Sequence, residues 1–275
     1  MNTTNSFSVL MSLYDKEKPN YLHDCFESLA QQTLTASEIV VVFDGPISNE
    51  LSAVVNLWQA KLPIKVIKLA KNVGLGNALN AGFQACNNEI IIRMDTDDIC
   101  VKERFDKQMA AFNDDETLAL VGGFIEEYDS ELQYSSGIRS VPLSQHEIQQ
   151  YAKLKNPFNH MTVAFKKSAI SKVGGYIDHP FMEDYNLWLR MISSKLPMSN
   201  LAEVLVKARA GDDMVNRRRG MNYINSEWKL AKHKFNLRIQ SLPASFATFI
   251  IRALPRLLPL KLIKSIYKIN RTKSI

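Results

Sequence analysis

Residues 89–98 read EIIIRMDTDD, a run typical of a buried strand that ends in three carboxylates. Two earlier runs have the same form: EIVVVF (38–43) leads into Asp44 and Gly45, and IKVIKL (64–69) leads into KNVGLG (71–76). Short apolar runs bounded by turn residues indicate strands that are covered on both faces. Ligands of open α/β sheets bind beyond the carboxyl ends of the strands, so the polar residues after these runs are the first candidates for a site.

The segments between these strands carry apolar residues at helical spacing. Strands are expected at 8–13, 38–43, 64–69 and 89–94, and helices around 21–29, 51–58, 76–86 and 104–112. This alternation predicts an α/β fold with a mostly parallel central sheet and helices on both faces. Beyond residue 115 the alternation becomes irregular. The second half should complete the sheet and form the other wall of a cleft, with strand-like runs at 118–126, 162–166 and 201–207, a hairpin or loop at 131–140, and an amphipathic helix at Glu183–Ser193.

The composition is that of an ordinary globular protein. The chain has 275 residues, of which 46% are hydrophobic and 23% charged, and this is enough for one large domain. Its three cysteines, Cys25, Cys86 and Cys100, form no spaced cluster, which argues against a disulfide framework or a zinc site and fits a reducing compartment. The N-terminal residues have neither a basic region nor a long apolar core, so we interpret them as a first strand rather than a signal peptide.

Charge is distributed unevenly along the chain. Residues 1–216 hold 20 Lys and Arg against 27 Asp and Glu, whereas residues 217–275 hold 14 Lys and Arg against the single acid Glu227. We therefore predict one domain at 1–215 and a helical, basic extension at 216–275. A basic extension indicates an anionic partner, either lipid headgroups or nucleic acid. No nucleic-acid-binding motif is recognisable, so no nucleic-acid partner is expected.

The extension contains LPASFATFIIRALPRLLPLKLIKSIYKI (242–269). Its longest uncharged stretch, Ile239–Ile251, has 13 residues, which is too short to span a bilayer, and prolines interrupt any long helix. Leu, Ile and Phe interleaved with Arg and Lys suit a segment that lies in an anionic membrane interface. The alternative is a set of helices that pack on the domain and leave a basic outer face.

The acids Asp95, Asp97 and Asp98 lie within four residues, so they repel one another unless a cation is present. Mn²⁺ and Mg²⁺ take oxygen ligands and commonly bridge carboxylates to substrate phosphates. The alternative is a solvated acidic turn. The pair Gly74 and Gly76 does not make a dinucleotide-binding fingerprint, because position 79 is Leu and the loop follows the third strand rather than the first.

Taken in order, these motifs resemble those of the family 2 glycosyltransferases, which have the GT-A fold, over roughly residues 7–235. The resemblance is carried by SVLMSLYDKEKPNYLHDCFESLAQQT (8–33), VVVFDG (40–45), NVGLGNALNAG (72–82), IRMDTDD (92–98), and VGGY (173–176) followed by EDYNLWLR (183–190). Two departures stand out. Ser12 occupies a place where family members often have proline, and FDGP (43–46) keeps only the second acid of the family's DDGS.

The resemblance implies an inverting transfer of a hexose, galactose or glucose, from a UDP-sugar. The implied acceptor is a sugar on a lipid diphosphate, such as GlcNAc-diphosphoundecaprenol, in O-antigen or surface polysaccharide synthesis. The enzyme would then be a peripheral protein on the cytoplasmic face of the bacterial inner membrane. Asp97 would be the main ligand of Mn²⁺ or Mg²⁺, and Asp95 would support the metal and contact the ribose. Asp44 would accept from the uracil ring, and the loop with Asn72 and Gly74 would pass close to the nucleotide.

At the acceptor end the resemblance implies Asp184 as general base, with Glu183 as the weaker candidate. By position alone, an acid there is also a first-turn residue favoured by the helix dipole. His160 resembles a recurrent histidine that could line the acceptor pocket, or it could be structural. Arg217 and Arg218 could fold over a diphosphate, since Arg binds phosphate oxygens bidentately, or begin a solvated helix. The rival functions are a nucleotidyltransferase and a non-catalytic, membrane-associated protein that binds nucleotide-sugars.

Overall fold

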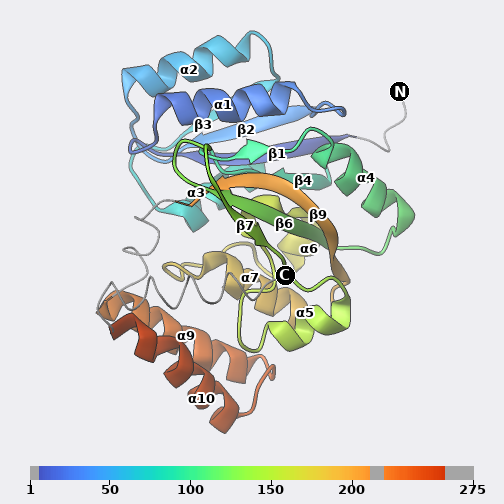
Figure 1. Cartoon of the computed structure of the whole chain (residues 1–275), viewed down its shortest axis with the longest axis vertical. Coiled ribbons are helices and arrows are strands. Elements are labelled where there is room, and N and C mark those ends of the chain that lie inside the picture. The colour runs from blue at the N-terminus through green and yellow to red at the C-terminus, as the bar shows by residue number, and fades with distance from the viewer. Residues whose placement is uncertain (1–5, 211–219, 258–275) are drawn as a thin grey trace.

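A computed structural model describes residues 6–210 and 220–257 of the chain. The described residues form one nine-stranded sheet in the order β3-β2-β1-β4-β8-β6-β9-β5, with β7 paired to β6 (Figure 1). The first four strands are parallel and carry the predicted apolar runs. They are β3 (Ile64–Lys68), β2 (Glu38–Phe43), β1 (Phe7–Leu13) and β4 (Ile90–Arg93).

The second half of the sheet is built around the long parallel pair β6 (Leu120–Tyr128) and β9 (Met198–Arg209). The short strand β8 (Ala164–Lys166) joins the two halves, because it lies antiparallel to both β4 and β6. β7 (Ser135–Arg139) makes a hairpin with β6, and β5 (Ile99–Cys100) pairs with the end of β9. The irregular half of the sequence therefore completes the sheet, as predicted.

Helices cover both faces of the sheet, as expected for strands whose successive side chains are all buried. Along β1, Val9 and Met11 belong to one core and Leu10 to the other. The first face carries α1 (Pro19–Ala30), α2 (Asn49–Gln59) and α4 (Arg104–Asp114) (Figure 1). The second carries α3 (Leu75–Ala85), α5 (Gln145–Tyr151), α6 (Lys167–Lys172), α7 (Glu183–Ser193) and α9 (Met221–Asn236).

Helix α3 lies unusually close to the strands beneath it. A Cβ at Gly82 would stand 2.4 Å from a Leu10 methyl and 2.6 Å from a Val42 methyl, so only glycine fits at this position. This contact fixes α3 over β1 and β2, with its N-terminus beyond their carboxyl ends. The loop that precedes α3 is therefore held over the sheet edge where ligands bind in this class of fold.

Two 3₁₀ turns complete the described structure. A 3₁₀ turn, η2 (His160–Thr162), precedes β8, so the strand expected at 162–166 begins two residues later. Helix α10 (Leu242–Ala253) packs against α9 and is followed by the 3₁₀ turn η3 (Leu254–Leu257) (Figure 1). Within residues 6–210 and 220–257, no helix combines the length and apolarity needed to cross a bilayer. The division of the chain at 215/216 stays a prediction.

Candidate active site

The parallel strands bring the predicted site residues to one edge of the sheet. The segments that follow β1 and β2 and the loop before α3 line a cavity of about 450 Å³, a volume in the range of small-ligand sites. Its lining includes Asp15 and Lys16 after β1, Asp44 after β2, and Asn72 from the loop. Of the predicted site residues, Asp44 and Asn72 therefore share this cavity, whereas Asp95 and Asp97 are not among the residues that line it.

Asp44 holds the loop that crosses this edge. Its carboxylate is buried and accepts hydrogen bonds from the backbone N–H groups of Val73 at 2.7 Å and Gly74 at 3.2 Å. The Asn72 side-chain amide donates to the Asp44 carbonyl oxygen at 3.2 Å. Gly45 has a φ of +89°, and a Cβ there would lie 2.6 Å from the Asn72 nitrogen. Asp44 thus organises the loop, in addition to any contact that it makes with the uracil ring.

The first turn of α3 contacts the start of α7. A Cβ at Gly76 would lie 3.1 Å from Cγ of Glu183 and 3.7 Å from Cβ of Tyr176. The glycine at 76 therefore makes room for a neighbouring helix, whereas the sequence motif alone suggested room for a nucleotide. Asn80 of α3 reinforces the contact, since its side chain bonds the Tyr176 backbone nitrogen at 2.9 Å and carbonyl at 2.7 Å.

Asp95 follows β4 and pairs with Arg93, a buried cation inside that strand. The Arg93 Nη2 to Asp95 Oδ1 distance is 2.6 Å, and His160 Nε2 lies 3.8 Å from Asp95 Oδ2. Burial would raise the pKa of Asp95, but the Arg93 guanidinium holds it below its usual value. Burial and the same guanidinium lower the pKa of His160. Asp95 therefore remains ionised, with a neutral imidazole favoured beside it.

Asp97 and Asp98 differ sharply in their surroundings. Burial, followed by the charges of Asp95 and Glu17, raises the pKa of Asp97 to about 7. Asp98 is buried, accepts the Arg209 backbone N–H at 2.9 Å, and has a pKa well above its usual range because of burial and Asp97. Asp98 thus anchors the end of β9, whereas Asp97 stays under net repulsion from its acidic neighbours.

This set of oxygen donors fits a divalent cation. Glu17 reaches the cluster from the loop after β1, because its Oε2 accepts the Thr96 hydroxyl at 2.7 Å. A cation beside Asp97 and Asp95 would relieve the repulsion that raises the pKa of Asp97, and Mn²⁺ and Mg²⁺ prefer such oxygen ligands. The residues present therefore suit the metal that the sequence predicted.

Asp184 stands at the first turn of α7 with both oxygens oriented. Its Oδ2 accepts the Asn156 amide at 2.8 Å, and its Oδ1 accepts the backbone N–H of Tyr185 at 2.7 Å. Neighbouring Glu183 is mostly buried, and that burial raises its pKa to about 7. The inward-facing side chains of this helix include Leu187, Trp188 and Met191, which are fully buried.

Between the two groups of acids lie two buried donors that find no hydrogen-bond partner among the described residues. They are Nη1 of Arg93 and the hydroxyl of Tyr176. The Arg93 cation interacts electrostatically with Asp95, Tyr176 and Asp184. Burial raises the pKa of the Tyr176 hydroxyl well above its usual value, so it stays protonated. This region therefore offers donors to an acceptor oxygen.

Sequence reasoning missed Glu17, Arg93, Tyr176 and Arg209 as members of this site. Arg93 carries a local signal, since a charge in an otherwise apolar strand requires a buried partner. Arg209 links the acids to α1: it donates to the Asp97 carbonyl and pairs with Asp24 at 2.7 Å. Arg217 and Arg218, predicted to bind diphosphate, lie outside the described residues.

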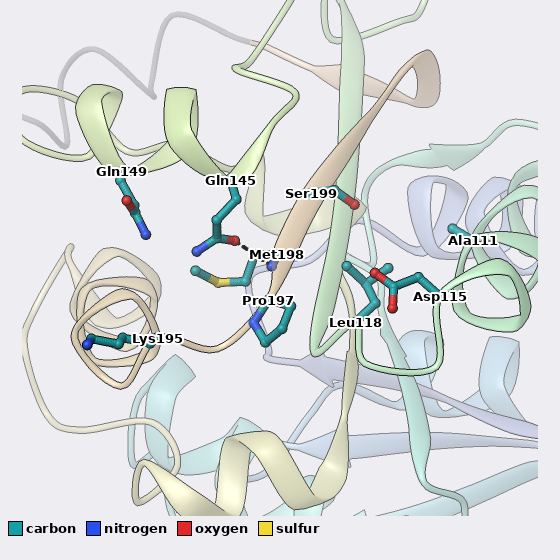
Figure 2. A pocket seen from close by; sticks show the side chains of 9 residues that line it. All are labelled: Ala111, Asp115, Leu118, Gln145, Gln149, Lys195, Pro197, Met198 and Ser199. Atoms are coloured by element: carbon teal, nitrogen blue, oxygen red, sulfur yellow. Dashed lines mark hydrogen bonds between the residues drawn. The ribbon is translucent and has the colours of Figure 1, made fainter.

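A second cavity, of about 500 Å³, lies elsewhere (Figure 2). It is formed where β6 and β9 begin, by the approaches to both strands and by α5, whose Gln145 Oε1 accepts the Met198 backbone N–H at 2.6 Å. None of the predicted site residues lines it. Because open α/β sheets bind ligands at the opposite ends of their parallel strands, we do not assign it to the donor.

The fold and the site together define a class of protein. The profile of Glycosyl transferase family 2 matches residues 8–174, and the chain belongs to this family. It is therefore a glycosyltransferase, of the hexosyltransferase type, and the nucleotidyltransferase and non-catalytic alternatives are set aside.

This chain resembles individual proteins as well as the family profile. The amylovoran biosynthesis glycosyltransferase AmsE of Erwinia amylovora is 48% identical over 265 residues, which cover 96% of this chain and 99% of that protein. The UDP-Gal:alpha-D-GlcNAc-diphosphoundecaprenol beta-1,3-galactosyltransferase of Escherichia coli is 35% identical, with 96% of each chain covered. Mannosyltransferase PcManGT from Pyrobaculum calidifontis, solved with GDP-Man and Mn²⁺, superposes with a TM-score of 0.63 at 13% identity, over 98% of this chain and 81% of that one. This likeness confirms the predicted GT-A fold.

Proposed function

We propose that this enzyme transfers galactose or glucose from a UDP-sugar to a sugar on a lipid diphosphate, with inversion, in O-antigen or surface polysaccharide synthesis. One observation carries the proposal: the acids after β4 and the acidic start of α7 converge on the same edge of the sheet. The Arg93 cation interacts electrostatically with both Asp95 and Asp184. The first turn of α3 contacts Glu183 at Gly76. The name of the 35% identical relative supports UDP-galactose as donor and GlcNAc-diphosphoundecaprenol as acceptor.

At the donor end, Asp97 and Asp95 would hold Mn²⁺ or Mg²⁺. When bound, the metal offsets negative charge on the leaving diphosphate. Arg93 keeps Asp95 ionised and oriented through its 2.6 Å ion pair. The Asp95 carboxylate can therefore bind a metal without first changing its charge or its orientation. Asp44 fixes the loop around Asn72 and Gly74, which bounds the cavity where the nucleoside would lie.

At the acceptor end, Asp184 would act as the general base. The acceptor hydroxyl oxygen forms a bond to the anomeric carbon, the bond from that carbon to the UDP oxygen breaks, and Asp184 takes the hydroxyl proton. Asn156 and the Tyr185 N–H hold the carboxylate in one orientation. His160, beside Asp95, lies where it could line the acceptor sugar's pocket.

We also propose that the enzyme works as a peripheral protein on the cytoplasmic face of the bacterial inner membrane. The acceptor would be carried on lipid, and the basic segment from residue 217 onward would be attracted to anionic headgroups. No nucleic-acid partner is proposed. Arg217 and Arg218 stay candidates for closing over the diphosphate.

A panel of UDP-sugars tests the proposal. Each is incubated with a synthetic GlcNAc-diphosphate-lipid and Mn²⁺ or Mg²⁺, and glycosylated lipid is measured by mass spectrometry. We expect hexose transfer from UDP-galactose or UDP-glucose that stops when EDTA removes the metal. Asp97→Asn should reproduce the effect of EDTA, whereas Asp114→Asn, an exposed acid on α4, should not. Transfer that persists in EDTA would refute the metal assignment, and failure of every UDP-sugar would refute the donor assignment.

A further inference from the structure

Helix α10 presents its apolar side to solvent. Its buried positions include the small polar residues Ser245 and Thr248, whereas Phe246 is 53% exposed and Ile251 is 64% exposed. A helix on the surface of a globular protein normally has the reverse arrangement, with its apolar stripe against the core. α10 therefore packs against α9, as the alternative drawn from the sequence had it, but its outer face is apolar rather than basic.

Polar contacts on the inner side of α10 fix this orientation. Arg252 points inward and makes a two-point ion pair with Glu227 of α9, at 2.6 and 2.9 Å. The same guanidinium donates to the Leu154 carbonyl at 2.9 Å, and Gln240 donates to the Thr248 hydroxyl at 3.0 Å. Rotating α10 to bury its apolar side would break a buried ion pair, which is strongly unfavourable.

The exposed apolar residues of α9, α10 and η3 are together called the outer apolar face. Within it the rings of Trp228, Phe246 and Phe249 are in mutual contact, with centroids 5.1 to 6.4 Å apart. Further exposed large side chains of α10 and η3 are Leu242, Ile250, Ile251 and Leu254. Large apolar side chains left exposed on two neighbouring helices mark an interaction site for a protein or a membrane.

The charges around the outer apolar face favour a lipid surface over a second copy. Lys229, Lys232 and Arg238 are exposed on or just after α9, and the Lys232 ammonium lies 5.1 Å from the Trp228 ring. Glu227, the single acid from residue 217 onward, is buried against Arg252. Two such basic surfaces would repel each other, whereas anionic headgroups would attract both.

The outer apolar face is also tied to the acceptor end of the active site. Arg252 lies over the ring of Tyr185, 5.4 Å from its centroid, and Tyr185 directly follows Asp184. On α9, the Ser226 carbonyl bonds His179 at 2.9 Å, and His179 bonds Asn186 of α7 at 3.0 Å. Binding of α9 and α10 to another surface would therefore also fix the position of α7, the helix that carries the proposed base.

We propose that the outer apolar face inserts its aromatic and aliphatic side chains into an anionic lipid bilayer, with the neighbouring Lys and Arg residues on the headgroups. Docking in this way places the start of α7 toward a membrane-borne acceptor, and this second part rests on the proposed function. Trp and Phe beside basic residues are the side chains that settle at the boundary between headgroups and acyl chains.

Vesicle sedimentation of the full chain tests the docking. The vesicles contain phosphatidylethanolamine with phosphatidylglycerol, or phosphatidylcholine alone. The test variant is Phe246→Gln/Ile251→Gln. The control is Leu57→Gln/Ile138→Gln, whose two side chains lie on α2 and β7 and are 52% and 51% exposed. We expect the wild type and the control to sediment with the anionic vesicles, and the test variant to lose roughly tenfold or more in partition at an unchanged melting temperature.

The outcomes separate the docking from the function. Equal partition of the test and control variants would overturn the docking. So would a wild-type dimer that the test variant abolishes while vesicle binding persists, because the face would then cover a second copy. Transfer to a short-chain, water-soluble acceptor should be equal in all variants, and only transfer to a vesicle-borne acceptor should fall. Vesicle binding by a chain that transfers no sugar would refute the proposed function and leave the docking intact.

Discussion

Asp184→Asn removes a base while preserving the shape of the side chain. In the structure one carboxylate oxygen accepts the Tyr185 N–H at 2.7 Å and the other accepts the Asn156 amide at 2.8 Å. An asparagine keeps the first contact with its carbonyl oxygen, and Asn156 can turn its own amide oxygen toward the new NH₂ group. The variant should therefore fold normally but be unable to take a proton.

The magnitude follows from what a positioned base contributes. General base catalysis is worth about 100- to 10,000-fold in rate, which is about 3 to 5 kcal/mol in activation free energy. We expect kcat to fall by that factor while the dissociation constant of the UDP-sugar changes by less than about threefold. UDP release measures the first quantity and calorimetric titration of the donor measures the second.

A nearby acid supplies the control. Asp178 is exposed on the loop before α7, and Asp178→Asn should leave kcat within about twofold of the wild type. If Asp184→Asn retains kcat within tenfold of the wild type, the assignment of the base is wrong. If Glu183→Gln alone removes the activity, the base is Glu183.

Three further predictions concern buried charges. Arg93→Met leaves Asp95 buried without its partner, so urea unfolding should show a loss of about 3 kcal/mol, and donor binding should weaken. Burial raises the pKa of Glu183 to about 7, so between pH 4.5 and 7 the folded chain binds a proton that the unfolded chain has released. The free energy of unfolding should therefore fall as the pH rises through this range. In melting curves recorded across the range, Glu183→Gln should remove this part of the decrease. Burial lowers the pKa of Lys234 to about 7, so between pH 7 and 10 the unfolded chain holds a proton on this residue that the folded chain has lost. The free energy of unfolding should therefore rise with pH across this range. A Lys234→Met variant that keeps the full increase in stability would contradict this.

Local patterns predicted individual elements closely. β2 in the first half and α7 in the second occupy Glu38–Phe43 and Glu183–Ser193, the bounds expected from an apolar run and from helical periodicity. The pairing of the second half could not be predicted in the same way. β6 and β9 lie about 80 residues apart, and their register shifts near Gly123 and Phe124. The turn before β8 depends on Thr162, whose hydroxyl bonds the Gly123 nitrogen at 3.0 Å, a contact that no local pattern reveals.

Some residues of the candidate site could likewise be predicted from the sequence and others could not. Asp44, Asp95 and Asp97 could be named from the sequence because they follow strands that end at one edge of a parallel sheet. Tyr176 and Glu17 could not, since their place beside the acids depends on α3 and on the loop after β1. The orientation of α10 depends on the pairing of Arg252 with Glu227, 25 residues away, so the sequence could not decide between a membrane-interfacial segment and packed helices with a basic outer face.

The anomeric configuration of the product tests the central claim most directly. The leaving diphosphate would lie at Asp97 and Asp95, and the proposed base, Asp184, would lie on the acceptor side, so one displacement should invert the anomeric carbon. Product made from an α-linked UDP-hexose and the GlcNAc-diphosphate-lipid would be analysed by proton NMR, from the coupling constant of the new anomeric proton. We predict a β-linked hexose. An α-linked product would mean retention, and it would contradict the roles assigned to both ends of the site.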